Sequence, residues 1–226
     1  MTPSAADILA QLRAKADPAN LEGMARYRIS VQNRLGLPMP ELRRIAKAAG
    51  KDHATALELW DTGIAEARIV ASLVAVPKQL TEEQMEAWVK DFDSWDVCDQ
   101  VCINLFEKSP LARRKIVEWS SREEEFVKRA AFALLACVAW HDKGAADEEL
   151  IAFLPVIVRG ATDERNFVKK AVNWALRTIG KRNRPLNQAA IQTAREIQRL
   201  DSKAARWIAA DALRELESEK VQERLG

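Results

Sequence analysis

Residues that interrupt helices are scarce in this chain of 226 residues, which holds only 8 Gly and 8 Pro. No segment alternates Val, Ile and Thr with polar residues as a strand would, whereas Ala, Leu, Glu, Lys and Arg recur throughout and favour helices. Hydrophobic residues make up 48% of the chain, which is enough to bury a sizeable core and argues against disorder. The composition therefore predicts a globular, all-helical protein.

Cysteine is also scarce, and its three copies are Cys98, Cys102 and Cys137. An odd number, with two copies four residues apart on an expected helix, argues against a disulfide framework and fits a reducing compartment. Residues 1–11 lack the basic-then-apolar pattern of a signal peptide, and no apolar run reaches the roughly 18 residues that a membrane span needs. We therefore expect a cytoplasmic protein that does not enter a membrane.

Motifs for nucleotides and metals are missing as well. There is no phosphate-binding glycine loop and no dinucleotide-binding glycine pattern. Cys98, Cys102 and His141 lack the fourth ligand that a structural zinc site uses. We expect neither a metal nor a cofactor.

Charge is balanced overall but unevenly distributed. The chain has 35 basic and 33 acidic residues, a net charge of +2. The segment 165–184 holds seven basic residues and no acid, whereas the segment 82–99 holds seven acids and one Lys. Such separated blocks can give a nearly neutral chain a basic face.

Helical periodicity runs nearly from end to end and is broken by Pro and Gly at regular intervals. Thr81-Glu-Glu-Gln84 predicts a capping box at the start of one helix. Phe126-Val-Lys-Arg-Ala130 recurs 41 residues later as Phe167-Val-Lys-Lys-Ala171, and comparable segments start near residues 67, 97 and 205. This spacing predicts a single domain over 1–226, a solenoid of HEAT-like helical repeats with a concave groove. An irregular helical bundle is the alternative.

Trp95 and Asp99 are four residues apart, so a helix places them on one face. Lys170, Trp174 and Arg177 share a face in the same way, with Asn173 beside them. A carboxylate near indoles can stabilise the oxocarbenium-like sugar formed when a glycosidic bond breaks. Taken singly, each Trp also fits a core position and each Lys a solvated surface.

These motifs resemble the DNA alkylation repair family of HEAT-like repeat glycosylases, the AlkD-like proteins. The resemblance runs from about residues 35–43 to residues 205–213. Its core is Trp95-Asp-Val-Cys-Asp99, Val127-Lys-Arg-Ala130 and Val168-Lys-Lys-Ala-Val-Asn-Trp174.

The resemblance implies a role for each matched position. Asp99 matches the catalytic carboxylate, Trp95 and Trp174 match the aromatic pair around the deoxyribose, and Arg129 matches an arginine that contacts the backbone near the lesion. The implied activity is excision of 3-methyladenine and 7-methylguanine from double-stranded DNA, without the closed base pocket that base-flipping enzymes use. A cationic base leaves as a neutral molecule, so this chemistry needs no general acid.

Flanking phosphates require cations, and the basic residues near these motifs are the candidates. The predicted DNA contacts are Lys128, Lys169, Lys170, Arg177, Lys181, Arg182 and Arg184. We expect the protein to act as a monomer on duplex DNA that contains alkylated bases.

Two positions depart from the family pattern. Cys98 stands where an aliphatic residue is expected, and Tyr27, the only tyrosine, matches the family's N-terminal active-site aromatic loosely. Two other functions stay open: a non-catalytic HEAT-repeat protein that binds distorted DNA, and a protein-binding scaffold.

Overall fold

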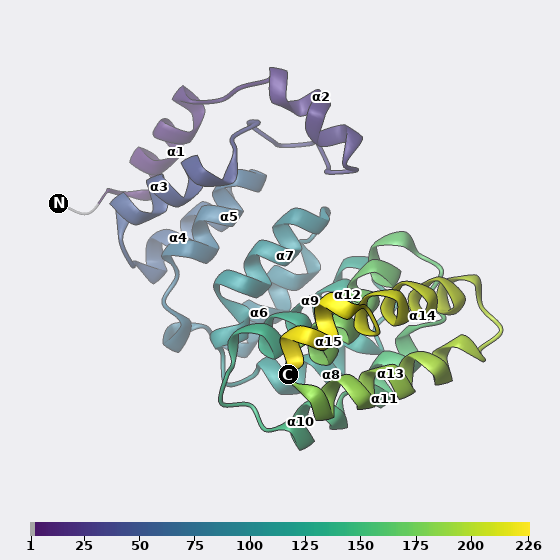
Figure 1. Ribbon diagram of the computed structural model, residues 1–226. Helices are drawn as coiled ribbons and strands as arrows, with labels where there is room; N and C mark the ends of the chain where they lie inside the picture. The colour runs from purple at the N-terminus through teal and green to yellow at the C-terminus, as the bar shows by residue number, and fades with distance from the viewer. Residues whose placement is uncertain (1–2) are drawn as a thin grey trace. The chain divides into compact units, whose positions relative to one another are not determined.

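The computed structural model describes residues 3–226, which form fifteen α-helices and two short 3-10 helices without a β-strand among them (Figure 1). The prediction of an all-helical protein is confirmed. Met1 and Thr2, the start of the segment expected to carry no signal peptide, lie outside the described residues. None of the helices in the described part of the chain has the length and apolar character needed to cross a membrane.

Two compact units divide the chain after Leu111. Unit 1 contains α1 (Ala5–Ala14), α2 (Ala19–Arg26), α3 (Met39–Ala49), α4 (His53–Asp61), α5 (Ala65–Val74), η1 (Pro77–Gln79), α6 (Glu82–Lys90), α7 (Trp95–Asn104) and η2 (Phe106–Lys108). Unit 2 contains α8 (Ala112–Ser120), α9 (Glu125–His141), α10 (Asp147–Ala152), α11 (Leu154–Gly160), α12 (Asn166–Gly180), α13 (Arg184–Gln198), α14 (Lys203–Leu216) and α15 (Glu219–Leu225). Each repeat of an array contacts only its neighbours, so this division is compatible with one array, and the single domain over 1–226 stays a prediction.

Local sequence signals account for the helix ends. Thr81 forms the predicted capping box: its hydroxyl accepts the backbone N–H of Gln84, whose side chain accepts the backbone N–H of Thr81.

Within unit 1, the indole of Trp60 on α4 stacks on that of Trp88 on α6, with ring centroids 3.9 Å apart. The Nε1 of Trp60 donates to Asp91 at 2.8 Å, so this buried tryptophan is fully satisfied.

Helix α9 is the core of unit 2. Its residues are buried from Arg129 to Ala139 without a gap, because α8 packs on one side and α12 on another. A helix that is apolar all round is stable only when neighbours cover every face, which explains why this segment shows no amphipathic pattern.

The repeated motif occupies equivalent places in α9 and α12. Phe126 and Phe167 are each the second residue of their helix, and their rings contact one another with centroids 5.4 Å apart. The segments predicted to start near residues 67, 97 and 205 begin at the third residue of α5, α7 and α14, one position later than in α9 and α12. The repeat seen in the sequence is therefore a repeat of helix starts.

Helix α12 has one buried and one polar face. Val168, Ala171, Val172, Ala175 and Ile179 are fully buried at helical spacing. The polar face therefore carries Lys170, Trp174, Arg177 and Lys181, the residues that concern the site.

Candidate nucleic-acid interface

Trp95 and Asp99 lie one turn apart at the start of α7, and both side chains are partly exposed. Val97 and Cys98, which lie between them, are buried and fix the orientation of this turn. Cys98 thus fills a core position as a small apolar side chain, which explains how it replaces the expected aliphatic residue.

The indole of Trp95 is held by a segment far away in the sequence. Its Nε1 donates to the carbonyl oxygen of Tyr27 at 3.1 Å, and Tyr27 itself is 75% exposed. The structure therefore brings Tyr27 beside Trp95 in unit 1, although sequence matching aligned Tyr27 only loosely.

An ion pair between buried Arg34 and partly buried Asp96 anchors the segment that follows Tyr27. Arg34 donates two hydrogen bonds to Asp96, at 2.7 and 3.0 Å, and a third to the carbonyl oxygen of Ser30. The hydroxyl of Ser94 accepts the backbone N–H of Ser30 at 3.1 Å. Asp96 consequently has a structural role next to Trp95, and a bidentate pair of this kind is specific in geometry.

Glu66 holds the end of the same segment. Its fully buried carboxylate accepts the backbone N–H groups of Leu35, Gly36 and Leu37 at 2.9, 2.8 and 3.3 Å. Gly36 has a φ of +83°, and a Cβ there would lie 2.1 Å from the carbonyl oxygen of Asp17. No pattern in the sequence singles out Glu66 or Arg34, because only the fold shows which groups their side chains contact.

In unit 2, Lys128 and Arg129 are the fourth and fifth residues of α9, and the side chains of both contact other parts of the unit. Lys128 pairs with Asp163 at 3.0 Å, and Asp163 also pairs with Arg165 at 2.6 Å. Arg129 is only 6% exposed and donates to the carbonyl oxygen of Phe167 at 2.6 Å, joining α9 to α12. Contact of Arg129 with the DNA backbone near a lesion stays a prediction, and its hydrogen bond to Phe167 shows that it also joins α9 to α12.

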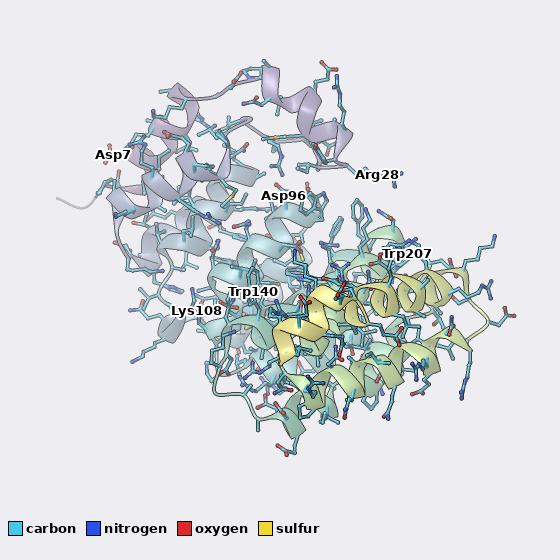
Figure 2. All side chains as sticks on the ribbon, viewed as in Figure 1. Asp7, Arg28, Asp96, Lys108, Trp140 and Trp207 are labelled. Atoms are coloured by element: carbon cyan, nitrogen blue, oxygen red, sulfur yellow. The ribbon has the colours of Figure 1, made fainter. Side chains whose placement is uncertain are left out.

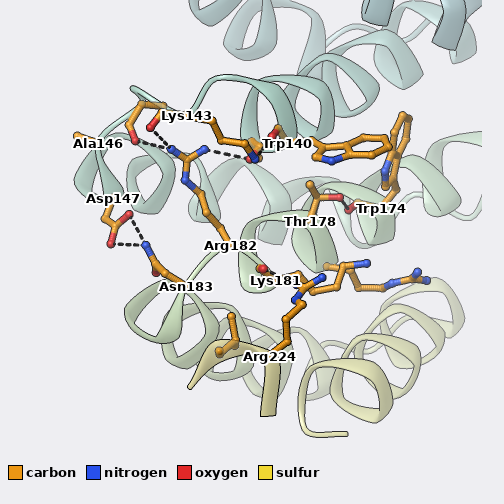
Figure 3. Close-up of a pocket in the computed structure, with 14 residues that line it drawn as sticks. Trp140, Lys143, Ala146, Asp147, Trp174, Thr178, Lys181, Arg182, Asn183 and Arg224 are labelled. Carbon is orange, nitrogen blue, oxygen red and sulfur yellow. Dashed lines mark hydrogen bonds between the residues drawn. The ribbon is translucent and has the colours of Figure 1, made fainter. Parts of the chain in front are cut away.

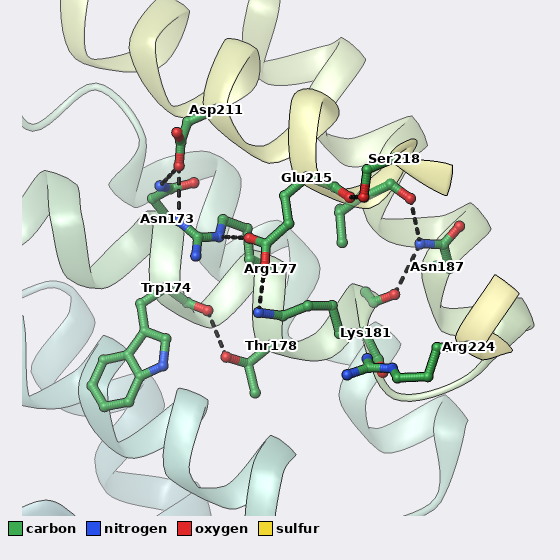
Figure 4. Close-up of polar contacts among 12 residues, drawn as sticks. Asn173, Trp174, Arg177, Thr178, Lys181, Asn187, Asp211, Glu215, Ser218 and Arg224 are labelled. Atoms are coloured by element: carbon green, nitrogen blue, oxygen red, sulfur yellow. Dashed lines mark hydrogen bonds and ion pairs between the residues drawn. The ribbon is translucent and has the colours of Figure 1, made fainter. Parts of the chain in front are cut away.

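Acids on α14 face the cations of α12 (Figure 4). Asp211 accepts from Asn173 at 2.7 Å and from Arg177 at 2.8 Å. Glu215 pairs with Arg177 and, at 2.8 Å, with Lys181. The pKa values of both acids are lowered: burial alone would raise them, but hydrogen bonds and the charges of these cations outweigh it. Asp211 and Glu215 were not among the residues predicted from the sequence, although their spacing of four places them on one helical face.

Arg182 binds backbone carbonyl groups at the C-terminal end of α9. Its guanidinium donates to four carbonyl oxygens, those of Ala139, Asp142, Lys143 and Ala145, at 2.6 to 3.1 Å. Carbonyls at a helix C-terminus lack partners within the helix, so Arg182 satisfies groups that would otherwise need water. These bonds give Arg182 a structural function besides its predicted phosphate contact.

In the described part of the chain, the three remaining predicted phosphate contacts, Lys169, Lys170 and Arg184, are not bound to acids or carbonyl oxygens in the way that Lys128, Arg177, Lys181 and Arg182 are. Lys169 lies over the ring of Trp207, with Nζ 4.9 Å from the ring centroid. Lys170 and Arg184 are exposed, and neither forms an ion pair within residues 3–226. Lys170 and Arg184 are therefore the cations best placed to meet a phosphate.

A pocket of about 950 Å³ opens on unit 2 at the C-terminal halves of α9 and α12 (Figure 3). Trp140 and Trp174 both line it, together with Arg177, Lys181 and Arg224. Sequence analysis named Trp174 but missed Trp140, whose indole is 54% exposed.

The ion pairs of Asp163 with Lys128 and Arg165 make the stability of the fold depend on pH. Burial alone would raise the pKa of Asp163, but hydrogen bonds from Arg165 and Lys128 lower it to about 2 from an ordinary 3.8. A lowered pKa means that these contacts stabilise the fold above pH 3.8 and that the stabilisation is lost as the pH falls toward 2.

We expect the wild type to lose about 2 kcal/mol more unfolding free energy between about pH 5 and pH 2 than Asp163→Asn loses. Urea unfolding at several pH values measures this difference. Asp201→Asn is the control, since Asp201 is fully exposed and should leave the pH dependence of the wild type intact. Parallel curves for the wild type and Asp163→Asn would refute the expectation.

Comparison with solved structures shows the fold. One neighbour, described as "a new family of proteins related to the HEAT-like repeat DNA glycosylases with affinity for branched DNA structures", superposes with a TM-score of 0.77. It is 18% identical, and the match covers 94% of this chain and 95% of that one. A designed armadillo repeat protein in complex with the peptide (KR)4 is 17% identical over 96% of this chain and 84% of its own, with a TM-score of 0.39. The first likeness confirms the HEAT-like helical repeat fold.

Sequence comparison gives the family. No curated protein matches the sequence significantly. The model of a family described as DNA alkylation repair enzyme matches residues 8–216, which is nearly the whole chain. The chain belongs to the DNA alkylation repair enzyme family.

Proposed function

We propose that this protein is a DNA glycosylase that excises 3-methyladenine and 7-methylguanine from duplex DNA. The observation that carries the proposal is the pair Trp95 and Asp99, one turn apart and partly exposed on α7, in a chain of a DNA alkylation repair family. The protein would act as a cytoplasmic monomer, with the duplex in a concave groove lined by the inner helices.

In the proposed mechanism, Asp99 stabilises the positive charge that develops on the deoxyribose as the base leaves. Preorganised electrostatic groups of this kind lower the barrier because they need no reorganisation during the reaction. Trp95 and Trp174 flank the sugar and add cation–π attraction. Arg129 and the lysines of α9 and α12 contact the flanking phosphates. The electron pair of the broken N-glycosidic bond leaves with the cationic purine and makes it neutral, so no residue has to protonate it. Water then adds to the sugar cation and loses a proton, which gives the abasic site.

A non-catalytic protein that binds distorted DNA is the main alternative. It is supported by the neighbour whose description includes affinity for branched DNA structures. A protein-binding scaffold is the second alternative. Both lack base excision, so an excision assay separates them from the proposed enzyme.

Asp99→Asn should lower the rate of base release on the order of 100- to 1,000-fold while duplex binding survives, because it removes the charge but keeps the shape. Single-turnover release of 7-methylguanine, followed by cleavage at the abasic site, measures the rate. Asp93→Asn is the matched control, since Asp93 is exposed just before α7 and should leave the rate unchanged. Excision by Asp99→Asn near the wild-type rate would remove Asp99 from this role.

The lesion spectrum should follow the charge of the leaving base. Duplexes that differ only in the lesion should release 7-methylguanine and 3-methyladenine, and bulkier cationic N3 or N7 adducts as well. Uracil and hypoxanthine should stay attached to the deoxyribose, because a neutral base needs a general acid to leave. Efficient uracil release, or a steep loss from methyl to larger cationic adducts, would contradict this mechanism.

Phosphate contacts should appear in the salt dependence of duplex binding. Each lost contact reduces the slope of log affinity against log salt by about 0.9, so the double variant Lys170→Gln/Arg184→Gln should flatten it by about 1.8. Arg199→Gln removes an exposed cation at the end of α13 and serves as the control. A slope unchanged in the double variant would place Lys170 and Arg184 away from the DNA.

A further inference from the structure

The pocket at the C-terminal halves of α9 and α12 is large enough for a bound molecule. Its volume of about 950 Å³ lies within the roughly 300–1,000 Å³ typical of small-ligand pockets. Every lining residue belongs to unit 2: they come from α9, α12 and α15, from the segment between α9 and α10 with the first residue of α10, and from the loop between α12 and α13. Helices and two loops of unit 2 together form the pocket wall.

Two aromatic side chains give the pocket a stacking surface. The indole of Trp140 is 54% exposed and rests on the ring of His141, with centroids 4.8 Å apart and planes 19° from parallel. Trp174 lines the same pocket and is partly exposed (Figure 3). Exposed indoles that face a pocket leave apolar area unburied, and they are typical of binding sites.

The rest of the lining is cationic. Lys143, Arg177, Lys181, Arg182 and Arg224 contribute five positive charges, whereas Asp147 is the one acid in the lining. Glu215, behind the lining, pairs with both Arg177 and Lys181. Within residues 3–226, Lys143 and Arg224 pair with no carboxylate: Lys143 donates to the carbonyl oxygen of Trp140 and Arg224 to that of Lys181.

An indole platform beside uncompensated cations suits a molecule with a flat apolar face and an anionic group. A nucleotide has both, since its base stacks on an aromatic ring and its phosphate meets Lys or Arg. Both base faces are covered inside a continuous duplex, so only an unpaired nucleotide can enter. We propose that this pocket binds one unpaired nucleotide of DNA, with the base on Trp140 and its phosphate near Lys143 and Arg224.

The proposal relies on the proposed function only in that the partner is DNA, and base excision plays no part in it. The test therefore uses unmodified DNA: a duplex with a single-nucleotide bulge and the continuous duplex of the same flanking sequence. The readout is the ratio of the two affinities, measured by fluorescence anisotropy. This ratio cancels phosphate contacts common to both duplexes.

We expect the wild type to bind the bulged duplex about fivefold or more tightly than the continuous one, the gain that stacking of one base supplies. Trp140→Ala should reduce the ratio to about one without weakening binding to the continuous duplex, and Trp140→Tyr should restore most of it. Trp207→Ala is the matched control, because Trp207 is exposed elsewhere on unit 2 and should leave the ratio unchanged (Figure 2).

Three outcomes would overturn the proposal: no preference for the bulge in the wild type, an unchanged ratio in Trp140→Ala, or an equal loss in Trp207→Ala. Displacement of the bulged probe by a polyglutamate peptide but not by a short oligothymidine would assign the pocket to a protein partner. If excision fails while the ratio depends on Trp140, the proposed glycosylase function is wrong and the nucleotide pocket stands.

Discussion

Packing of α9 against α12 is the contact on which the rest of unit 2 depends. The paired rings of Phe126 and Phe167 set the register of the two helices, and Arg129 ties α9 to the backbone of Phe167. Because α9 is buried along most of its length and α12 is buried on one side, only the other side of α12 is left for polar residues. The position of Trp174 on that side is a consequence of core packing.

Charge in the sequence and charge at the surface differ in this protein. The basic run from 165 to 184 contains no acid, yet Arg177 and Lys181 each face a carboxylate from α14. Arg182 is engaged with carbonyl oxygens at the end of α9. The pairs hold α12 and α14 together, so a cation here contributes to the fold as well as to the field that an approaching anion meets.

In unit 1, buried polar contacts hold the irregular segment between α2 and α3 against the neighbouring helices. Glu66 gathers three backbone N–H groups, and Arg34 binds Asp96 beside Trp95. Both groups are buried, so each needs its partner to offset the cost of leaving water. The result is a defined position for the carbonyl of Tyr27, which accepts the indole N–H of Trp95. The buried carboxylate of Glu66 thus helps to hold the segment that positions Trp95, a residue that the proposed chemistry uses.

Local sequence patterns determined the helices, the capping box at Thr81 and the recurrence of the Phe126 motif at Phe167, because each of these features depends only on residues close together in the chain. They also placed Trp95 one turn from Asp99. The tertiary structure alone decided the burial of Arg129, the carboxylate partners of Arg177 and Lys181, and the pocket that joins Trp140 to Trp174. These contacts join helices some 30 to 40 residues apart in the sequence, and the geometry of helix packing, which no local pattern encodes, determines which side chains meet.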